Sequence, residues 1–214
     1  MVNARALLTQ PEALRAHVHA ALAKSGAAAR PLRPGIRRAA VLLALVHAHG
    51  EAALLLTERS DAVERHKGQI SLPGGAVEPG ESPLDAALRE TREEIGVRAE
   101  DVTVLGALDD EETVVSGFLL TPFVGSIPYP YPFRASPAEV QRVLEVPVRT
   151  LLDPRNVRAE EWTHDGERRT VLFFTAGKDV VWGATARVIM QFLRAVFQPA
   201  LPQDGDQRAA RRGR

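Results

Sequence analysis

The chain has 214 residues, of which 45% are hydrophobic and 25% charged, and its 27 basic side chains balance 27 acidic ones. Such a composition is that of one globular domain with a real core, which excludes a mainly disordered chain. The balanced charge argues against nucleic acid as a partner. No apolar run approaches the roughly 20 residues of a membrane-spanning helix. With no cysteine and no signal-peptide pattern at the N-terminus, the sequence predicts a cytoplasmic protein without a membrane partner.

The N-terminal part predicts one helix followed by a connector. Apolar residues recur at helical spacing over 11–24, and Gly26 ends the pattern. The segment 30–38 is rich in proline and arginine, which is typical of an irregular connection. Residues 1–37 are therefore interpreted as an N-terminal helix and connector.

A β-hairpin is predicted next, because two apolar runs at 39–47 and 52–57 are separated by His49-Gly50. Both runs are apolar throughout, so these strands should be covered on both faces. Further strands are predicted at 69–72, 102–108, 117–125 and 170–174, a short helix and turn at 136–152, and a closing helix at 183–197. This order predicts an α/β fold, a sandwich of helices on a mixed β-sheet. The domain would span 38–198, and 199–214 would form a flexible basic tail.

The clearest helical signal begins at Ser82, a plausible N-cap that Pro83 follows at the first helical position. Gly96 ends this helix. The core face is predicted to carry Leu84, Leu88, Thr91 and Ile95. Because Thr91 points to the core, its hydroxyl needs a partner such as the carbonyl of the preceding turn.

Three carboxylates gather on a flank of the same helix, with Glu90 and Glu94 one turn apart and Glu93 beside them. Like charges at this spacing repel, so such a cluster either spreads into water or holds a cation. Oxygen ligands of this kind suit Mg²⁺ or Mn²⁺. Taken alone, the cluster is more typical of a solvated helix face than of a metal site.

The register of the surrounding residues identifies the cluster. Gly75, Glu81, Arg89-Glu90, Glu93-Glu94 and Gly96-Val97 stand at the spacing of the Nudix box, so the chain resembles the Nudix hydrolases. This resemblance implies a Nudix-type α/β/α sandwich and a metal-dependent attack of water on a diphosphate. It makes Glu90, Glu93 and Glu94 the metal ligands, with Glu94 or Glu93 as the catalytic base and Glu111 or Glu112 as the alternative. Glu81 and Arg89 are expected to pair and brace the loop, and Gly96 to be structural.

The stretch before the box is similar to the signature of the coenzyme A diphosphatases. The matching residues are Leu55-Leu56-Thr57, Arg59-Ser60, Gly68 and Pro73-Gly74-Gly75, and later blocks such as 181–187 resemble the same enzymes. The resemblance implies cleavage of coenzyme A or its derivatives to 3′,5′-ADP and 4′-phosphopantetheine or its acyl form. Glu64 and Leu72 depart from the signature, which keeps open ADP-ribose, a dinucleotide or a nucleoside triphosphate as substrate. A Nudix domain that only senses a nucleotide is a further alternative.

Phosphate groups need cations, and Arg59 and Lys67 are the candidates before the box. Gly74 and Gly75 would let the backbone approach the substrate closely. The aromatic residues Phe118, Phe123 and the segment 129–133 are candidates for contact with the pantetheine arm, with a packed loop as the alternative for the segment. Homodimers are common among the enzymes that the chain resembles, but the sequence leaves the oligomeric state open.

Overall fold

The structure, a computed structural model, describes residues 4–60, 68–113, 117–164 and 166–198. Its main sheet runs in the order β3-β2-β1-β7-β5, with β4 paired to β1, β6 to β7 and β8 to β2. β1 and β7 are parallel and the other neighbours antiparallel, so the predicted mixed sheet is confirmed. These strands are β1 (Arg37–Ala48), β2 (Glu51–Arg59), β3 (Ile70–Ser71), β4 (Gly74–Ala76), β5 (Thr103–Ala107), β6 (Glu111–Glu112), β7 (Phe118–Ser126) and β8 (Val140–Pro147).

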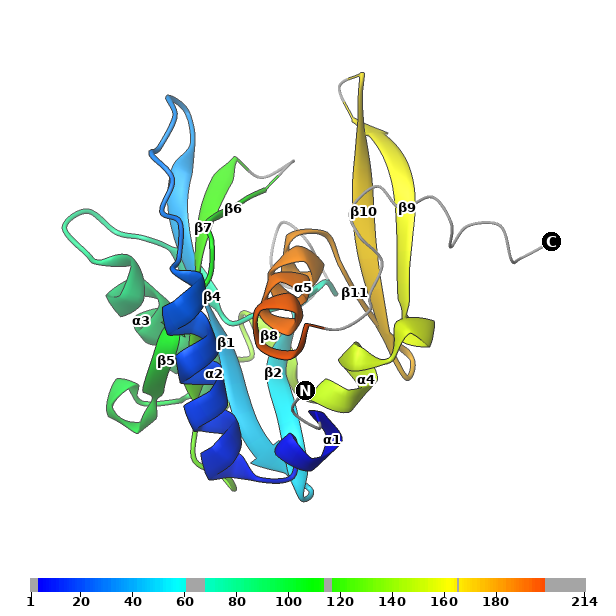
Figure 1. Ribbon diagram of the computed structural model, residues 1–214. Coiled ribbons are helices and arrows are strands. Elements are labelled where there is room, and N and C mark those ends of the chain that lie inside the picture. Colours follow the sequence, from blue (N-terminus) through cyan, green and yellow to red (C-terminus); the bar gives the residue numbers. More distant parts are fainter. Residues whose placement is uncertain (1–3, 61–67, 114–116, 165, 199–214) are drawn as a thin grey trace.

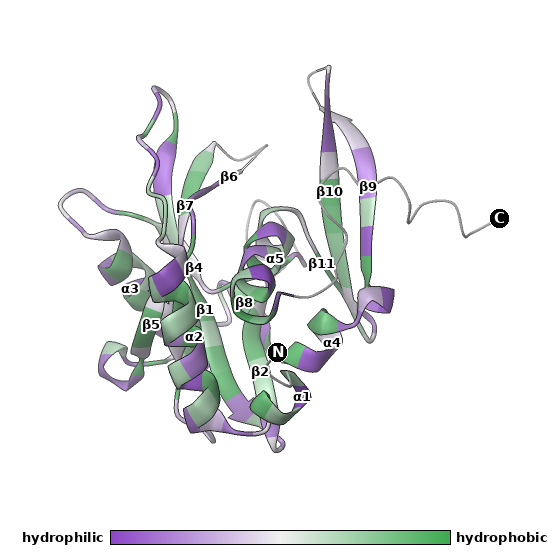
Figure 2. Ribbon diagram, viewed as in Figure 1, coloured by the Kyte–Doolittle hydropathy of each residue, from purple (hydrophilic) through white to green (hydrophobic). Residues whose placement is uncertain are grey.

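Helices cover both faces of this sheet, as Figure 1 shows. They are α1 (Ala4–Leu7), α2 (Pro11–Ser25), α3 (Pro83–Ile95), α4 (Val148–Leu152) and α5 (Gly183–Phe197), with short 3₁₀ turns at Ala99–Asp101 and Pro154–Asn156. Successive side chains of β1 point to opposite faces of the sheet. Leu43 belongs to the core cluster that also contains Val18 of α2 and residues of α5, whereas Leu42 belongs to the cluster with Ile95 of α3. This two-sided burial explains the continuous apolar run in β1 and β2, which Figure 2 shows as hydrophobic strands at the centre.

Helix α3 begins and ends as the sequence predicts. The Ser82 side chain accepts a hydrogen bond from the Asp85 N–H, and Gly96 adopts a left-handed conformation at the C-terminal end. The predicted core face is only half right, because Leu84 and Leu88 are partly exposed while Thr91 and Ile95 are buried. The helix instead turns Ala86 and Ala87 toward Ala40 of β1. These small side chains let the helix approach the sheet closely, which rotates the buried face away from the two leucines.

The predicted helix and turn at 136–152 is wrong for most of its length. Residues 140–147 form strand β8, which pairs antiparallel with β2, and only 148–152 are helical. Leu144 and Val146 alternate with less buried neighbours along this strand. Pairing with the free edge of β2 outweighs the local helical tendency of this short segment.

A second sheet consists of β9 (Val157–His164), β10 (Glu167–Ala176) and β11 (Asp179–Trp182). Of these strands, the sequence predicts only the part of β10 at 170–174. The β9–β10 hairpin stands apart from the main sheet in Figure 1, on the other side of α5 from β7. Arg142 of β8 links the two sheets, since its guanidinium donates hydrogen bonds to Glu58 of β2 and Asp179 of β11. This side chain therefore ties the two sheets together at one point.

The N-terminal helix α2 lies on the domain, with Leu14, Val18 and Leu22 buried in the main core cluster. The connector after it is fastened to the sheet through buried Asp110. This carboxylate accepts hydrogen bonds from the Arg30 N–H and from the Arg38 guanidinium, at 2.8 and 2.9 Å. The predicted tail at 199–214 lies outside the described residues. Among the described helices, none combines the length and hydrophobicity that crossing a membrane requires.

Candidate active site

Three carboxylates meet at the end of helix α3. Oxygen atoms of Glu90, Glu94 and Glu139 all lie within 4.8 Å of one another. Glu90 and Glu94 come from successive turns of the helix, as predicted, and Glu139 comes from the turn that precedes β8. The sequence does not indicate Glu139, because no local motif distinguishes a single glutamate in a short turn.

Backbone hydrogen bonds hold this turn against the helix. The Ser136 N–H donates to the Glu94 carbonyl at 2.8 Å, and the Glu139 N–H donates back to Ser136 at 3.0 Å. On its other side, the Glu139 carbonyl accepts a hydrogen bond from the Ser60 N–H at 2.8 Å. The turn is therefore tied both to α3 and to the chain that follows β2, which fixes where the third carboxylate lies.

The electrostatics of the cluster favour a cation. Burial, reinforced by the charge of Glu90, raises the pKa of Glu94 to about 8, although Arg59 and a Gly74 backbone hydrogen bond oppose the shift. Burial also raises the pKa of Glu90. The buried Oε2 of Glu94 has no hydrogen-bond partner among the described residues. A buried oxygen without a partner is costly, and a divalent cation would satisfy it. The donor set, oxygen only, therefore fits Mg²⁺ or Mn²⁺.

Close contacts require glycine at positions 74 and 75, directly before the loop 76–81. A Cβ atom on Gly75 would lie 2.4 Å from the Glu90 carboxylate carbon. A Cβ atom on Gly74, whose φ is +148°, would lie 2.3 Å from the Ala40 carbonyl oxygen. Any side chain at either position would collide, so the glycines let the main chain touch both the sheet and the carboxylate cluster.

The expected pair between Glu81 and Arg89 is present. The Arg89 guanidinium donates to Glu81 at 2.9 and 3.1 Å and to the Ala76 carbonyl at 3.1 Å. This hydrogen bonding lowers the pKa of Glu81. Arg89 also donates to Glu90 at 2.9 Å. The arginine thus ties the loop 76–81 to the helix and orients one carboxylate of the cluster.

Other acidic candidates lie outside the cluster. Glu93 is about half exposed and accepts a hydrogen bond from Arg89 at 3.1 Å, so the structure does not bring its carboxylate to the other three. Glu111 accepts hydrogen bonds from Arg187 at 2.6 Å and from Gln191 at 3.0 Å. Glu112 pairs with the Arg33 guanidinium. To act as the base, Glu111 would have to give up its hydrogen bonds to Arg187 and Gln191. Glu112 would have to give up its ion pair with Arg33.

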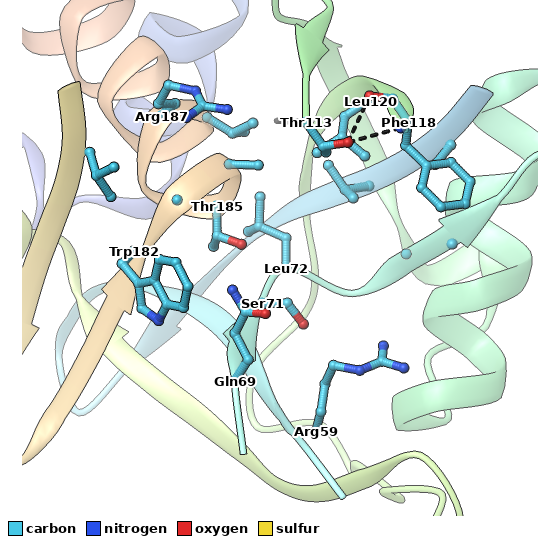
Figure 3. A pocket seen from close by; sticks show the side chains of 18 of the residues that line it. Arg59, Gln69, Ser71, Leu72, Thr113, Phe118, Leu120, Trp182, Thr185 and Arg187 are labelled. Carbon is cyan, nitrogen blue, oxygen red and sulfur yellow. Dashed lines mark hydrogen bonds between the residues drawn. The ribbon is translucent and has the colours of Figure 1, made fainter. Parts of the chain in front are cut away.

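A cleft of about 560 Å³ opens between the two sheets beside the box. Gly74, Gly75 and Arg59 line it together with the N-terminal end of α5 and the second sheet. Figure 3 shows Arg59 on one side and Trp182 and Thr185 on the other. The cleft wall carries Arg59, Arg169 and Arg187. Two of these charges are balanced by carboxylates outside the lining, since Arg187 pairs with Glu111 at 2.6 Å and Arg169 with Glu167 at 2.7 Å. The buried Nε of Arg59 has no hydrogen-bond partner in the described part of the chain. The wall therefore suits an anionic ligand.

The other residues predicted to contact the substrate lie in different parts of the chain. Lys67 lies outside the described residues. Phe118 lines the cleft, and the Arg37 guanidinium lies 4.5 Å from the centre of its ring. Phe123 and the aromatic residues of 129–133 pack against the core cluster under α3. The alternative of a packed loop is thus confirmed for that segment.

Comparisons with known proteins agree with this geometry. A family model described as NUDIX domain matches residues 36–167. A protein of Photorhabdus laumondii named "Uncharacterized Nudix hydrolase NudL" is 35% identical over 161 residues, which cover 75% of this chain and 85% of that protein. Its Escherichia coli namesake is 37% identical over 156 residues, covering 72% and 80% respectively. The crystal structure of a MutT/nudix family protein from Enterococcus faecalis has a TM-score of 0.54 at 18% identity, over 80% of this chain and 66% of that one, which supports the shared fold.

Proposed function

Because the chain belongs to the Nudix hydrolase family, we propose that it cleaves the diphosphate of coenzyme A or its derivatives to 3′,5′-ADP and 4′-phosphopantetheine or its acyl form. The observation that carries the proposal is one cleft that both the box glycines and Arg59 of the upstream motif line. Coenzyme A is rich in phosphate, and Arg59, whose buried Nε has no hydrogen-bond partner among the described residues, provides a cation that complements that charge.

The reaction adds one water to the diphosphate. The water oxygen forms a bond to phosphorus, the bond from that phosphorus to the bridging oxygen breaks, and the bridging oxygen leaves on the other phosphate. A bound Mg²⁺ or Mn²⁺ would neutralise the diphosphate charge and lower the pKa of the attacking water. Glu90, Glu94 and Glu139 would hold that cation, and Glu93 stays a predicted ligand.

The chain's own residues would position the substrate and accept the proton. Gly74 and Gly75 would let the diphosphate approach the carboxylates, and Arg59 would bind a phosphate with its guanidinium. Glu94 is the first candidate for the base, as the register of the box implies. Glu93 is the second candidate for that role.

The first experiment incubates the protein with Mg²⁺ or Mn²⁺ and, separately, coenzyme A, ADP-ribose and dGTP, and separates the products. Release of 3′,5′-ADP from coenzyme A far faster than cleavage of the others is the expected result. Faster cleavage of another diphosphate would overturn the substrate assignment and retain the hydrolase. No cleavage of any, together with tight nucleotide binding, would favour the sensing alternative.

A pair of arginine variants tests the role of Arg59. Arg59→Gln should raise KM for coenzyme A by about tenfold or more, because a charged hydrogen bond to phosphate contributes roughly 1.5–3 kcal/mol. Arg155→Gln is the matched control, since that side chain is 87% exposed and pairs with Asp153 away from the cleft. An unchanged KM in Arg59→Gln would remove this residue from the binding site.

A further inference from the structure

Three aromatic rings form a cluster on the second sheet. Trp162 of β9 lies 5.8 Å from Phe173 of β10 and 5.8 Å from Trp182 at the end of β11, between ring centres. Phe173 and Trp182 are stacked at 6.2 Å with an angle of 18° between their planes. Phe173 is 5% exposed, but Trp162 is 44% exposed. The cluster thus has a buried base and an open aromatic surface.

The orientation of the open ring is fixed before any ligand binds. The Trp162 indole N–H donates a hydrogen bond to the Glu160 carboxylate at 2.9 Å, and Phe173 supports the ring from the neighbouring strand. The exposed part of the indole, oriented by these contacts, is accessible to a ligand in the cleft. A fixed ring also loses little conformational entropy on binding.

This surface belongs to the same cleft as the diphosphate site. Trp162 and Trp182 line it together with Arg59 and Gly75. Figure 3 shows Trp182 on one side of the cleft and Arg59 on the other, with Gln69 and Ser71 between them. A ligand whose phosphates lie at Arg59 and the box can therefore extend across the cleft to the aromatic cluster.

We propose that Trp162 and Trp182 form a stacking platform for the adenine base of the substrate. The proposal rests on the proposed function for the identity of the nucleotide half. An indole face favours a planar heteroaromatic ring, because stacking needs two parallel faces. The planes of Trp162 and Trp182 are inclined by 43° to each other, so the base stacks on the more exposed Trp162 while Trp182 supports that ring. The flexible pantetheine arm offers amide and methyl groups and no such face. The base-bearing half thus matches the platform better than the pantetheine half.

The protein has two tryptophans, and both belong to this cluster. Intrinsic tryptophan fluorescence therefore reports on this surface alone. Titration with 3′,5′-ADP should change the fluorescence, whereas 4′-phosphopantetheine at the same concentrations should not. A fluorescence change with 4′-phosphopantetheine and none with 3′,5′-ADP would overturn the assignment.

Variants separate stacking from a general disturbance of the cleft. Trp162→Ala should raise the Kd for 3′,5′-ADP by about 5- to 150-fold, the range that stacking of one base on an aromatic side chain supplies. Trp162→Phe keeps an aromatic face and should retain most of the affinity. Val180→Ala is the control, since Val180 is 39% exposed on the same sheet and does not line the cleft. An unchanged Kd in Trp162→Ala, measured by calorimetry, would refute the platform.

The stacking proposal and the proposed cleavage of coenzyme A can fail independently of each other. ADP carries the same base without the pantetheine arm, so it should alter the fluorescence whichever adenine-containing diphosphate the enzyme cleaves. Failure of coenzyme A cleavage with a fluorescence response to ADP would refute only the proposed substrate. Coenzyme A cleavage with an unchanged KM in Trp162→Ala would refute only the platform.

Discussion

Replacing Gly75 by alanine should damage catalysis without unfolding the protein. The added methyl group would lie 2.4 Å from the Glu90 carboxylate carbon and 2.4 Å from one of its oxygens. The backbone at Gly75, unlike that at Gly74, is not in the positive-φ region that strains other residues. The whole effect therefore falls on the position of one carboxylate in the cluster.

The size of the displacement follows from the contact distances. Ordinary contact begins at 3.4 Å, so the Glu90 carboxylate must retreat by about 1 Å from its present 2.4 Å. The atoms that move are the end of a flexible side chain, so the free energy of unfolding should change by less than about 1 kcal/mol. Metal–ligand distances tolerate a change of only about 0.2 Å. Misplacing a catalytic group by about 1 Å costs roughly a hundredfold in rate.

The assay is the steady-state rate over a range of Mg²⁺ concentrations, with a thermal melt of the same sample. Gly75→Ala should lower kcat/KM about a hundredfold and require more Mg²⁺ for half its maximal rate. Gly74→Ala is the contrasting variant, because its methyl group would meet the backbone oxygen of Ala40, which cannot retreat, so the melting temperature should fall with activity.

Two results would refute this reasoning. One is a Gly75→Ala enzyme with the wild-type rate and Mg²⁺ dependence, since the displaced Glu90 would then have no catalytic role. The other is a double variant, Gly75→Ala with Glu90→Asp, that is clearly worse than Glu90→Asp alone. Aspartate is shorter by one carbon–carbon bond, about 1.5 Å, and should remove the collision.

Three further predictions concern other parts of the chain. Burial and the charge of Glu90 raise the pKa of Glu94 from 4.5 to about 8, so the native state keeps a proton that the unfolded chain releases. Without metal, the wild type should lose stability in thermal melts between about pH 4.5 and 8, a loss absent in Glu94→Gln, which should turn over several hundredfold more slowly. Arg142→Ala should remove the link between the two sheets, costing about 1 kcal/mol and lowering the melting temperature by about 2–4 °C; an unchanged melt would contradict this role. Deleting residues 203–214 should leave turnover of coenzyme A intact, and a large loss would make the tail part of the site.

The sequence alone determines the parts of the fold that depend on neighbours along the chain. Helix α3 could be placed from its cap residues, because Ser82 and Gly96 act on the backbone of the helix itself. The Thr91 hydroxyl finds the predicted partner, the Ala87 carbonyl one turn earlier, at 2.6 Å. The register of the box likewise brings Glu81 to Arg89 and stacks Glu90 and Glu94, since helical geometry fixes those spacings.

Only the tertiary structure decides which distant residues complete the site. Glu139 joins the carboxylates because β8 pairs with β2 and delivers its preceding turn to the end of α3. Glu93, adjacent to Glu94 in sequence, lies outside the cluster because the helix turns it toward Arg89 and solvent. The aromatic wall of the cleft depends on strand pairing in the second sheet, which joins Trp182 to Phe173. Strand pairing acts between segments far apart in the chain, so no local pattern records which residues it will bring together.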